Sequence, residues 1–242
     1  MKYDSAFYSE KGGRDVNEDA ASVTAKAHSL LAIVADGLGG MGDGKVASED
    51  AVSCLSDRLL EKSMDEDLLC AEMMVENQRI LNMHHNGKQM MTTVAVLWAE
   101  GDQALAATIG DTRIYQFRGE KIEFQSTDHS VAQLAVFSGA ITREQLRNYP
   151  GRNRLLRALG AEEQVQVDLQ ELHLLPGDRL LICSDGFWKL IVEQEMLLWG
   201  GEETAEQWLN RMRMMASQRC GSCGDNHSAI AVIITEETEY AG

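Results

Sequence analysis

Aspartates stand beside several apolar segments of this chain, a pattern that could hold metal ions. Asp36 follows the run LLAIVA, Asp111 follows ALAATIG, and Asp185 follows DRLLICS. Asp225 lies a few residues before another apolar run, AIAVIIT. A single Asp beside a strand is typical of a turn or a helix cap. Its recurrence in several strand–turn contexts favours a shared metal site.

A further acidic segment, RDVNED, carries Arg14, Glu18 and Asp19. These carboxylates together predict a binuclear site of oxygen ligands, and the few histidines favour magnesium or manganese over zinc. Two such ions, held roughly 3.5–4 Å apart, stabilise in-line displacement at phosphorus. The planar guanidinium of Arg14 could hold two phosphate oxygens. The alternative for Arg14 is a surface ion pair with a neighbouring acid.

The segment VADGLGGMGDG, residues 34–44, also fits the dinucleotide-binding pattern G-x-G-x-x-G. Its glycines are Gly37, Gly39 and Gly42. Asp36 and Asp43 would repel a pyrophosphate there. Asp57, at the distance of a ribose-binding acid, falls within an expected helix. The preferred interpretation is that Asp36 binds a cation, while the glycines let the backbone approach closely and offer a carbonyl ligand.

Strands and helices are mixed along the whole sequence. Helices are expected at residues 43–61, 66–83 and 203–218, where apolar residues recur at helical spacing. Strands are expected at residues 6–10, 30–35, 92–98, 104–109, 113–117, 121–125, 165–172, 178–184 and 229–235. Short turns at 99–103 and 118–120 join neighbouring strands, so these strands are antiparallel. This order disfavours a doubly wound dinucleotide fold.

Length and composition fit a single domain spanning residues 1–242. The net charge of −16 and the pI of about 4.7 disfavour nucleic acid and anionic membranes as partners, and suit cations. No apolar run approaches the length of a membrane span, and the first residues contain no signal-peptide core. A cytoplasmic protein without membrane insertion is therefore expected.

The cysteines number five, and an odd count without an export signal favours reduced thiols. Cys220 and Cys223 form one C-x-x-C in the segment RCGSCGDN. A structural zinc needs four ligands, and the sequence has no second pair of this kind. The preferred interpretation is a loop of small residues, and a redox pair is the alternative.

Eight segments together point to a known family. They are RDVNED at 14–19, VADGLGGMGDG at 34–44, MTTVAV at 91–96, IGDTRIY at 109–115, TDHS at 127–130, NRLLRALG at 153–160, PGDRLLICSDGFW at 176–188 and GDNHSAI at 224–230. In these segments and their order, the chain resembles the metal-dependent Ser/Thr protein phosphatases of type 2C (PPM), in their compact bacterial form. The resemblance implies an α+β fold, a four-layer α-β-β-α sandwich of two mainly antiparallel sheets flanked by helices, with a binuclear metal cleft at one end.

The same resemblance implies a set of metal ligands for two Mn²⁺ or Mg²⁺ ions. Asp36 is similar to the acid that bridges both ions, and Gly37 to the carbonyl ligand. Glu18 resembles a ligand of the second ion, while Asp185 and Asp225 resemble ligands of the first. The activity implied is hydrolysis of phosphoserine and phosphothreonine on proteins by metal-activated water.

Further roles come from the same resemblance. Arg14 corresponds to the phosphate clamp and, with Asp36, to the catalytic residues. Asp111 resembles a ligand of a third, weaker metal site, and Asp19 a group that supports the site through water. Residues 131–152 resemble a mobile flap beside the cleft, with movement permitted by two glycines, Gly139 and Gly151.

Leu38 departs from the family pattern, because some relatives carry there a histidine proposed as the general acid. Metal-bound water or another group must then protonate the leaving serine alkoxide.

The implied partners are phosphorylated proteins and a cognate bacterial Ser/Thr kinase, with a link to type VI secretion, and a monomer is expected. Two alternatives stay open: a catalytically inactive phosphatase-like module that binds a partner protein, and a metal-binding regulator that uses the C-x-x-C as a redox switch.

Overall fold

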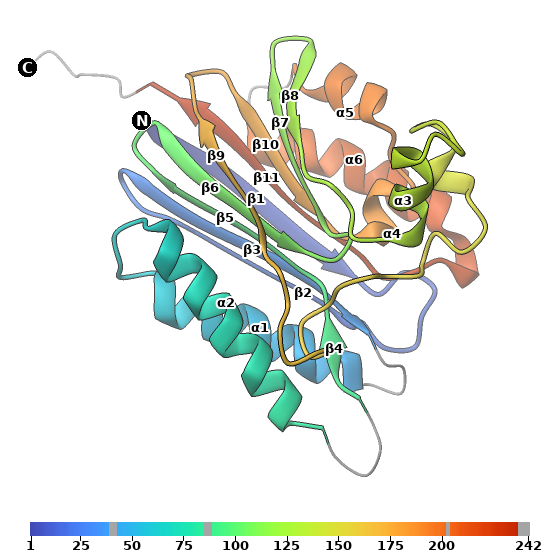
Figure 1. Cartoon of the computed structure of the whole chain (residues 1–242). Helices are drawn as coiled ribbons and strands as arrows, with labels where there is room; N and C mark the ends of the chain where they lie inside the picture. The colour runs from blue at the N-terminus through green and yellow to red at the C-terminus, as the bar shows by residue number, and fades with distance from the viewer. Residues whose placement is uncertain (39–42, 85–88, 202–203, 237–242) are drawn as a thin grey trace, which may run out of the picture.

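The computed structural model describes residues 1–38, 43–84, 89–201 and 204–236. In this part of the chain, two antiparallel sheets stack face to face, and helices cover the outer face of each (Figure 1). The expected α+β sandwich of four layers is confirmed. No helix within the described ranges is both long and apolar enough to cross a membrane.

The first sheet has the strand order β1-β11-β10-β7-β8. Its strands are β1 (Lys2–Glu10), β7 (Arg113–Arg118), β8 (Lys121–Gln125), β10 (Arg179–Cys183) and β11 (His227–Thr235). The second sheet has the order β2-β3-β5-β6-β9, and a short strand β4 pairs with β3. Its strands are β2 (Asp19–Ala25), β3 (Ser29–Leu38), β4 (Met91–Thr92), β5 (Val94–Glu100), β6 (Gln103–Ile109) and β9 (Asp168–His173).

The apolar run of β3 is continuous because both of its faces are buried. Leu30, Ala32 and Val34 belong to the core between the sheets. The alternating residues Leu31, Ile33 and Ala35 belong instead to the core beneath the helices. This follows from the two-residue side-chain period of a strand, and such a central strand must read as an unbroken hydrophobic stretch.

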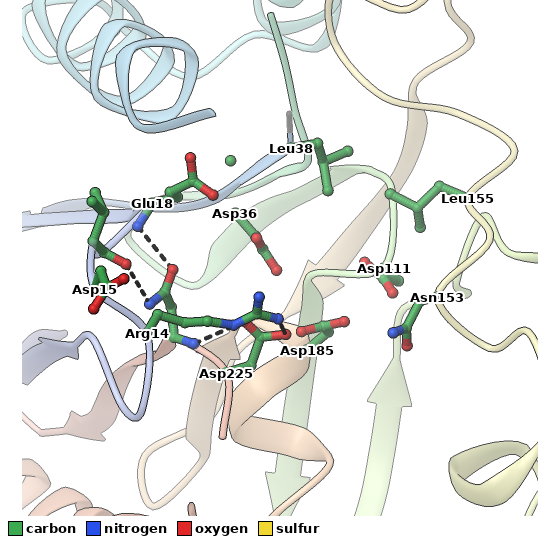
Figure 2. Close-up of a pocket in the computed structure, with 13 residues that line it drawn as sticks. Arg14, Asp15, Glu18, Asp36, Leu38, Asp111, Asn153, Leu155, Asp185 and Asp225 are labelled. Atoms are coloured by element: carbon green, nitrogen blue, oxygen red, sulfur yellow. Dashed lines mark hydrogen bonds and ion pairs between the residues drawn. The ribbon is translucent and has the colours of Figure 1, made fainter. Parts of the chain in front are cut away.

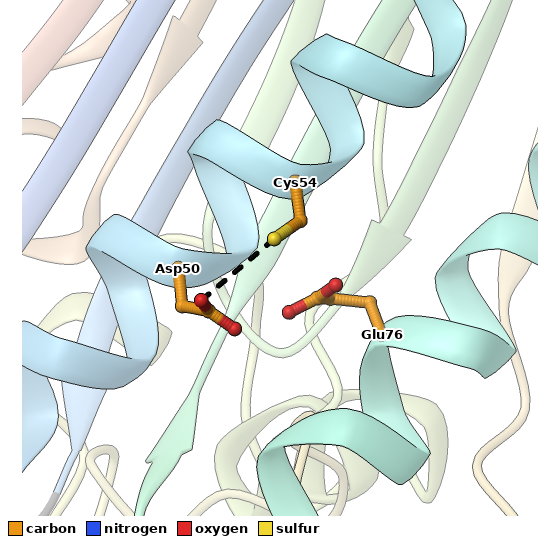
Figure 3. A group of neighbouring side chains, drawn as sticks. All are labelled: Asp50, Cys54 and Glu76. Atoms are coloured by element: carbon orange, nitrogen blue, oxygen red, sulfur yellow. Dashed lines mark hydrogen bonds between the residues drawn. The ribbon is translucent and has the colours of Figure 1, made fainter.

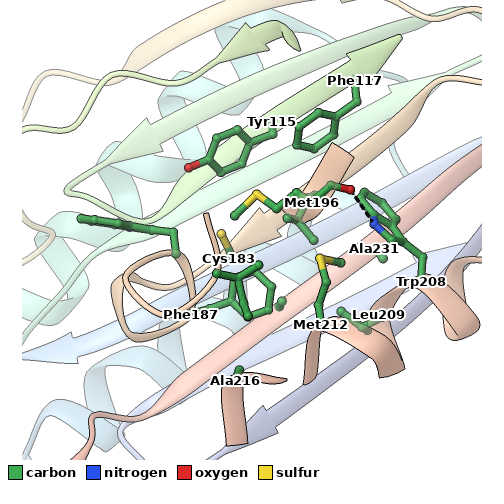
Figure 4. Packing of buried hydrophobic residues seen from close by; sticks show 14 of the residues in the cluster. Tyr115, Phe117, Cys183, Phe187, Met196, Trp208, Leu209, Met212, Ala216 and Ala231 are labelled. Carbon is green, nitrogen blue, oxygen red and sulfur yellow. Dashed lines mark hydrogen bonds between the residues drawn. The ribbon is translucent and has the colours of Figure 1, made fainter. Parts of the chain in front are cut away.

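Helices α1 (Asp43–Leu59) and α2 (Glu66–Asn82) cover the second sheet. The first sheet is covered by α4 (Asp185–Trp188), α5 (Glu193–Trp199) and α6 (Ala205–Cys220), and α6 is followed by a 3₁₀ turn, η2 (Gly221–Cys223). Figure 4 shows the core beneath these helices, where Trp208, Phe117 and Met212 are fully buried. The indole Nε1 of Trp208 donates to the carbonyl of Met196 at 3.0 Å, which fixes α6 against α5.

The predicted helices and strands are largely confirmed, with ends that differ by a few residues. Strand β2 was not expected, because its sequence DAASVTA has small and polar residues that suit an edge strand and give little hydrophobic signal. Helix α3 (Val131–Phe137) and the 3₁₀ turn η1 (Leu146–Asn148) lie within the expected flap. The short helices α4 and α5 were also missed, since neither is long enough to show helical periodicity.

Candidate metal centre and active site

A cavity of about 630 Å³ opens at one end of the sandwich, and acidic residues line it. Figure 2 shows carboxylates from separate segments pointing into this space. The predicted residues among its lining are Arg14, Glu18, Asp36, Gly37, Asp111, Asp185 and Asp225. The structure thus brings together seven of the eight predicted site residues, and the eighth, Asp19, pairs across the sheet with Asp36.

Antiparallel pairing explains why residues so distant in sequence meet here. Asp36 lies near the end of β3 and is paired there with Asp19, the first residue of β2. Strand β10 ends two residues before Asp185, and β11 begins immediately after Asn226. In antiparallel sheets, the end of one strand lies beside the start of its neighbour. The strand–turn pattern of the acids therefore places them at one end of both sheets.

Backbone contacts fix Asp36 and Gly37 in place. The Asp36 amide donates to Thr93 Oγ1 at 3.1 Å, and Thr92 Oγ1 donates to the Asp36 carbonyl at 2.9 Å. A Cβ at Gly37 would lie 2.2 Å from the carbonyl oxygen of Gly44, so only glycine fits between β3 and α1. The sequence had suggested this close approach. Gly39 and Gly42, the other glycines of the motif, lie outside the described residues.

Asp19 carries a buried acceptor that lacks a partner. One carboxylate oxygen accepts a hydrogen bond from Ser184 Oγ at 2.7 Å, while the buried Oδ1 has no hydrogen-bond partner among the described residues. Burial raises the pKa of Asp19 to about 7, although the Ser184 hydroxyl acts in the opposite direction. A buried acceptor of this kind is costly unless a cation or a water satisfies it.

The floor of the cavity is strongly unfavourable for several negative charges in the absence of cations. Burial raises the pKa of Asp36 well above its usual range, and the carboxylates of Asp19 and Asp185 raise it further. Burial and the Asp185 carboxylate likewise raise the pKa of Asp111. Divalent cations would relieve this repulsion, and carboxylate and carbonyl oxygens are the ligands that Mg²⁺ and Mn²⁺ prefer. The residues present therefore fit the metal ions that the sequence predicts.

Arg14 lies at the mouth of the cavity and pairs with Asp225. Its Nε and Nη2 atoms lie 3.0 and 3.1 Å from the two carboxylate oxygens of Asp225. This hydrogen-bonded pair raises the pKa of the Arg14 guanidinium. The side chain remains largely exposed, at 59%, so the guanidinium faces the solvent where a phosphate group would arrive.

Asn226 is a site residue for which the sequence predicted no role. Its side chain accepts a hydrogen bond from the Glu18 amide at 2.8 Å. It also donates to the carbonyls of Lys11 and Val16, at 2.8 and 3.0 Å. Asn226 therefore ties the loop that carries Arg14 and Glu18 to the segment that carries Asp225. A buried Asn directly after a predicted ligand is the signal that could have identified it.

Lys189 and Trp188 are two further residues that the sequence analysis did not single out. Lys189 forms an ion pair with Asp185, one helical turn before it. Its ammonium group also donates to Asn153 Oδ1 at 2.9 Å. The indole Nε1 of Trp188 donates to the carbonyl of Asp111 at 2.8 Å. Helix α4 is thereby joined to the loop after β6 and to the segment after the expected flap.

The expected flap begins with α3 and continues to Arg152, just before two residues of the cavity wall, Asn153 and Leu155. Gly139 and Gly151 both adopt positive φ angles, of 72° and 81°, which favour glycine. The segment thus leads directly into the cavity wall, although none of residues 131–152 is part of the lining. Movement of the segment stays a prediction.

The two cysteines of the C-x-x-C motif are free thiols close to the cavity. Cys220 ends α6, and its Sγ atom lies 3.5 Å from the carbonyl oxygen of Asp225. The structure thus places the motif beside a predicted metal ligand, and the redox alternative stays a prediction.

Leu38 lines the cavity, and no histidine is found among the described residues of its wall.

The fold is a sandwich of two antiparallel sheets between helical layers, and a cleft lined by oxygen atoms lies at the ends of the sheets. This combination is typical of metal-dependent phosphate-ester hydrolases. Residues 9–222 of the chain match the family described as protein phosphatase 2C. The chain belongs to this family, as its sequence motifs predicted.

The chain is similar to bacterial phosphatases both in sequence and in structure. The chain is 36% identical to the serine/threonine phosphatase stp of Listeria welshimeri over 203 residues, which cover 78% of this chain and 80% of that protein. The structure of PppA from Pseudomonas aeruginosa, described as a key regulatory component of T6SS, superposes with a TM-score of 0.84 at 31% identity, covering 96% of this chain and 98% of PppA. The catalytic domain of the phosphatase PstP in complex with two manganese ions gives a TM-score of 0.83 at 27% identity, covering 97% and 99% of the two chains.

Proposed function

We propose that this protein is a metal-dependent phosphatase that hydrolyses phosphoserine and phosphothreonine in proteins. The observation that carries the proposal is the convergence of the predicted carboxylates on one cavity, with a buried oxygen of Asp19 that has no hydrogen-bond partner in the described part of the chain. Two Mn²⁺ or Mg²⁺ ions would be held by Glu18, Asp36, the Gly37 carbonyl, Asp185 and Asp225. Bound ions of this kind supply a water nucleophile near neutral pH and offset the charge of the phosphate.

The chain's own residues bind and orient the substrate. The exposed guanidinium of Arg14 receives the phosphate, and its contact with Asp225 fixes its planar fork at the mouth of the cavity. Asn226 holds the loop that carries Arg14 and Glu18 against the segment that carries Asp225. Because Leu38 provides no proton donor, water in the open cavity protonates the leaving serine or threonine oxygen.

The substrates follow from the chemistry of the site and from the relatives. An open cavity with an arginine at its mouth suits a phosphorylated side chain on a protein surface. By analogy with PppA, described as a key regulatory component of T6SS, the protein takes part in type VI secretion control. A phosphatase of this kind needs substrates that a Ser/Thr kinase has phosphorylated, and we propose such a kinase as its counterpart. We further propose a monomeric enzyme with one catalytic domain over residues 1–242, acting in the cytoplasm.

The test measures phosphate release from a phosphothreonine peptide, with Mn²⁺ and then with a chelator. Wild type should require the metal, and Asp36→Asn should lose on the order of 10²-fold or more in kcat/KM, since the change removes the charge of a buried carboxylate that would hold the ions. Asp102→Asn, an exposed aspartate outside the cavity, is the matched control and should retain activity.

Absence of activity with every divalent metal, in wild type shown to be folded, would contradict the enzymatic proposal. It would instead favour the inactive module that binds a partner protein. That alternative predicts the loss of metal ligands, whereas this chain retains each predicted acid.

A further inference from the structure

Lys189 places a positive charge against two residues that line the acidic cavity, Asp185 and Asn153. It follows α4, and its backbone amide donates to the Asp185 carbonyl at 3.0 Å, so its side chain lies one turn from that carboxylate. The ammonium group pairs with Asp185 and donates to Asn153 Oδ1 at 2.9 Å. Its side chain is only 16% exposed. The lysine therefore lies half-buried directly behind two residues of the cavity wall.

The aromatic ring of Trp188 supports this arrangement. The Lys189 ammonium lies 5.5 Å from the ring centroid, within the range of a cation–π contact. The same indole donates its N–H to the Asp111 carbonyl at 2.8 Å. One aromatic residue thus positions both the lysine and the loop that carries Asp111. The Lys189 charge acts on the Asp111 carboxyl in the direction that favours its ionised form.

The groups around the ammonium are oxygen donors of the kind that bind hard divalent cations. They are the Asp185 carboxylate, the Asn153 side-chain carbonyl and, nearby, the Asp111 carboxylate. Lysine satisfies such donors with one positive charge and with N–H groups. A divalent ion would have to displace it in order to use the same oxygens.

The charges of the cavity agree with this. The described acids at the site are Asp15, Glu18, Asp19, Asp36, Asp111, Asp185 and Asp225, and Arg14 and Lys189 pair with two of them. Two divalent ions would leave this set of acids and cations with a net charge of −1, and a third would bring it to +1. Without Lys189, three divalent ions would bring the set to zero, so the lysine supplies part of the charge that a third ion would otherwise provide. Asp128, which also acts on Asp111, is already paired with the buried Arg113 at 2.7 Å.

We propose that the ammonium group of Lys189 takes the place of a third metal ion beside Asp111 and Asp185, so that the cavity holds two divalent ions and not three. The inference rests on the proposed function, because it concerns the same metal site. It replaces the role of third-ion ligand that the family resemblance implied for Asp111. Lys189 is then a built-in cation that holds Asp185 and the Asn153 segment together.

The test counts bound Mn²⁺ without any substrate, by calorimetric titration and by electron paramagnetic resonance of the free ion. Wild type should bind two ions per chain. Lys189→Met, which keeps most of the length of the side chain but removes its charge, should bind a third ion. Anomalous scattering from Mn²⁺-soaked crystals should place that ion beside Asp111. The double variant Lys189→Met with Asp111→Asn should return to two.

Two controls separate the charge from the shape of the side chain. Lys189→Arg keeps the charge and should bind two ions, and Lys26→Met removes a surface lysine far from the cavity and should also bind two. Circular dichroism verifies that each variant is folded. Three ions in wild type, or two in folded Lys189→Met, would overturn the proposal. Because turnover is not measured, failure of the phosphatase proposal would be seen separately in the peptide assay.

Discussion

At the scale of single residues, Arg14 combines an exposed guanidinium with a contact to Asp225, a predicted metal ligand. We expect Arg14→Lys to lower kcat/KM for a phosphothreonine peptide by about 10–100-fold, because lysine cannot offer two parallel N–H groups to a phosphate. Steady-state kinetics in saturating Mn²⁺ measure the effect. The affinity for Mn²⁺ should change little, since the positive charge beside Asp225 is kept, and an unchanged kcat/KM would remove Arg14 from substrate binding.

Gly37 is a residue whose lack of a side chain is required by its surroundings. We expect Gly37→Ala to destabilise the fold by about 1–3 kcal/mol and to weaken Mn²⁺ binding, because the new Cβ would lie 2.2 Å from the Gly44 carbonyl oxygen. Urea unfolding with and without Mn²⁺ measures both effects. Gly201→Ala is the matched control, as a Cβ there meets nothing within 4 Å. Equal stability of the two variants would contradict this prediction.

At the scale of elements, the contact between α1 and α2 contains an unusual polar cluster. Figure 3 shows Asp50 and Cys54 on one helix facing Glu76 on the other. Glu76 is fully buried, and neither of its oxygens has a hydrogen bond of good geometry in the described part of the chain. Arg58 lies 3.1 Å from Glu76, and Arg79 lies 2.6 Å from Asp50. Two arginines thus balance the two carboxylates, which leaves little reason for a metal ion to bind there.

This cluster makes the stability of the helix pair depend on pH. Burial, followed by the neighbouring Asp50, raises the pKa of Glu76 to about 7. A carboxyl whose pKa is raised on folding stabilises the protein at low pH, and this contribution is lost as the pH rises from about 4.5 to about 7. At pH 8 we therefore expect Glu76→Gln to be more stable than wild type, by up to about 3 kcal/mol.

Urea unfolding at pH 5 and at pH 8 measures the difference. The gain should be larger at pH 8 than at pH 5, because wild-type Glu76 is protonated in the folded protein at pH 5. Glu72→Gln, one turn earlier on α2 and partly exposed beside Arg58, is the matched control and should show no such gain. A gain that does not vary with pH would show that Glu76 is not the titrating group.

At the scale of the whole molecule, repulsion between the buried carboxylates lowers the stability of the folded protein when no metal is bound. We expect Mn²⁺ at about 100 times its dissociation constant to raise stability by about 2.7 kcal/mol, or the melting temperature by roughly 5–10 °C for a chain of this size. Metal-free Asp36→Asn should melt a few degrees higher than metal-free wild type, because one of the repelling charges is removed. Calorimetry with Mn²⁺ and with chelator measures both values.

The response of the variant to metal provides the control for this experiment. Added Mn²⁺ should raise the melting temperature of Asp36→Asn much less than that of wild type. Asp102→Asn, outside the cavity, should behave like wild type in both conditions. If Mn²⁺ stabilised wild type and Asp36→Asn equally, the metal site would not include Asp36.

The sequence by itself determined the family, the order of the main elements and most of the acids that meet at the cavity. Acids beside apolar runs are a local signal, and antiparallel strands joined by short turns must bring such acids to one end of the sheets. The predicted convergence of Asp36, Asp111, Asp185 and Asp225 is therefore confirmed. Their roles as metal ligands stay predictions, as do the catalytic role of Arg14 and the single domain.

Only the tertiary structure decided which partners these residues have. Arg14 pairs with Asp225, Asp19 meets Ser184, and Lys189 links Asp185 to Asn153. Except for the neighbours Asp185 and Lys189, these contacts join segments far apart in the sequence. The small residues of β2 and the short helices α3, α4 and α5 escaped prediction because their packing, more than their local pattern, stabilises them. Local spacing sets which face of an element a side chain occupies, but the packing of the sheets and helices sets which charges meet.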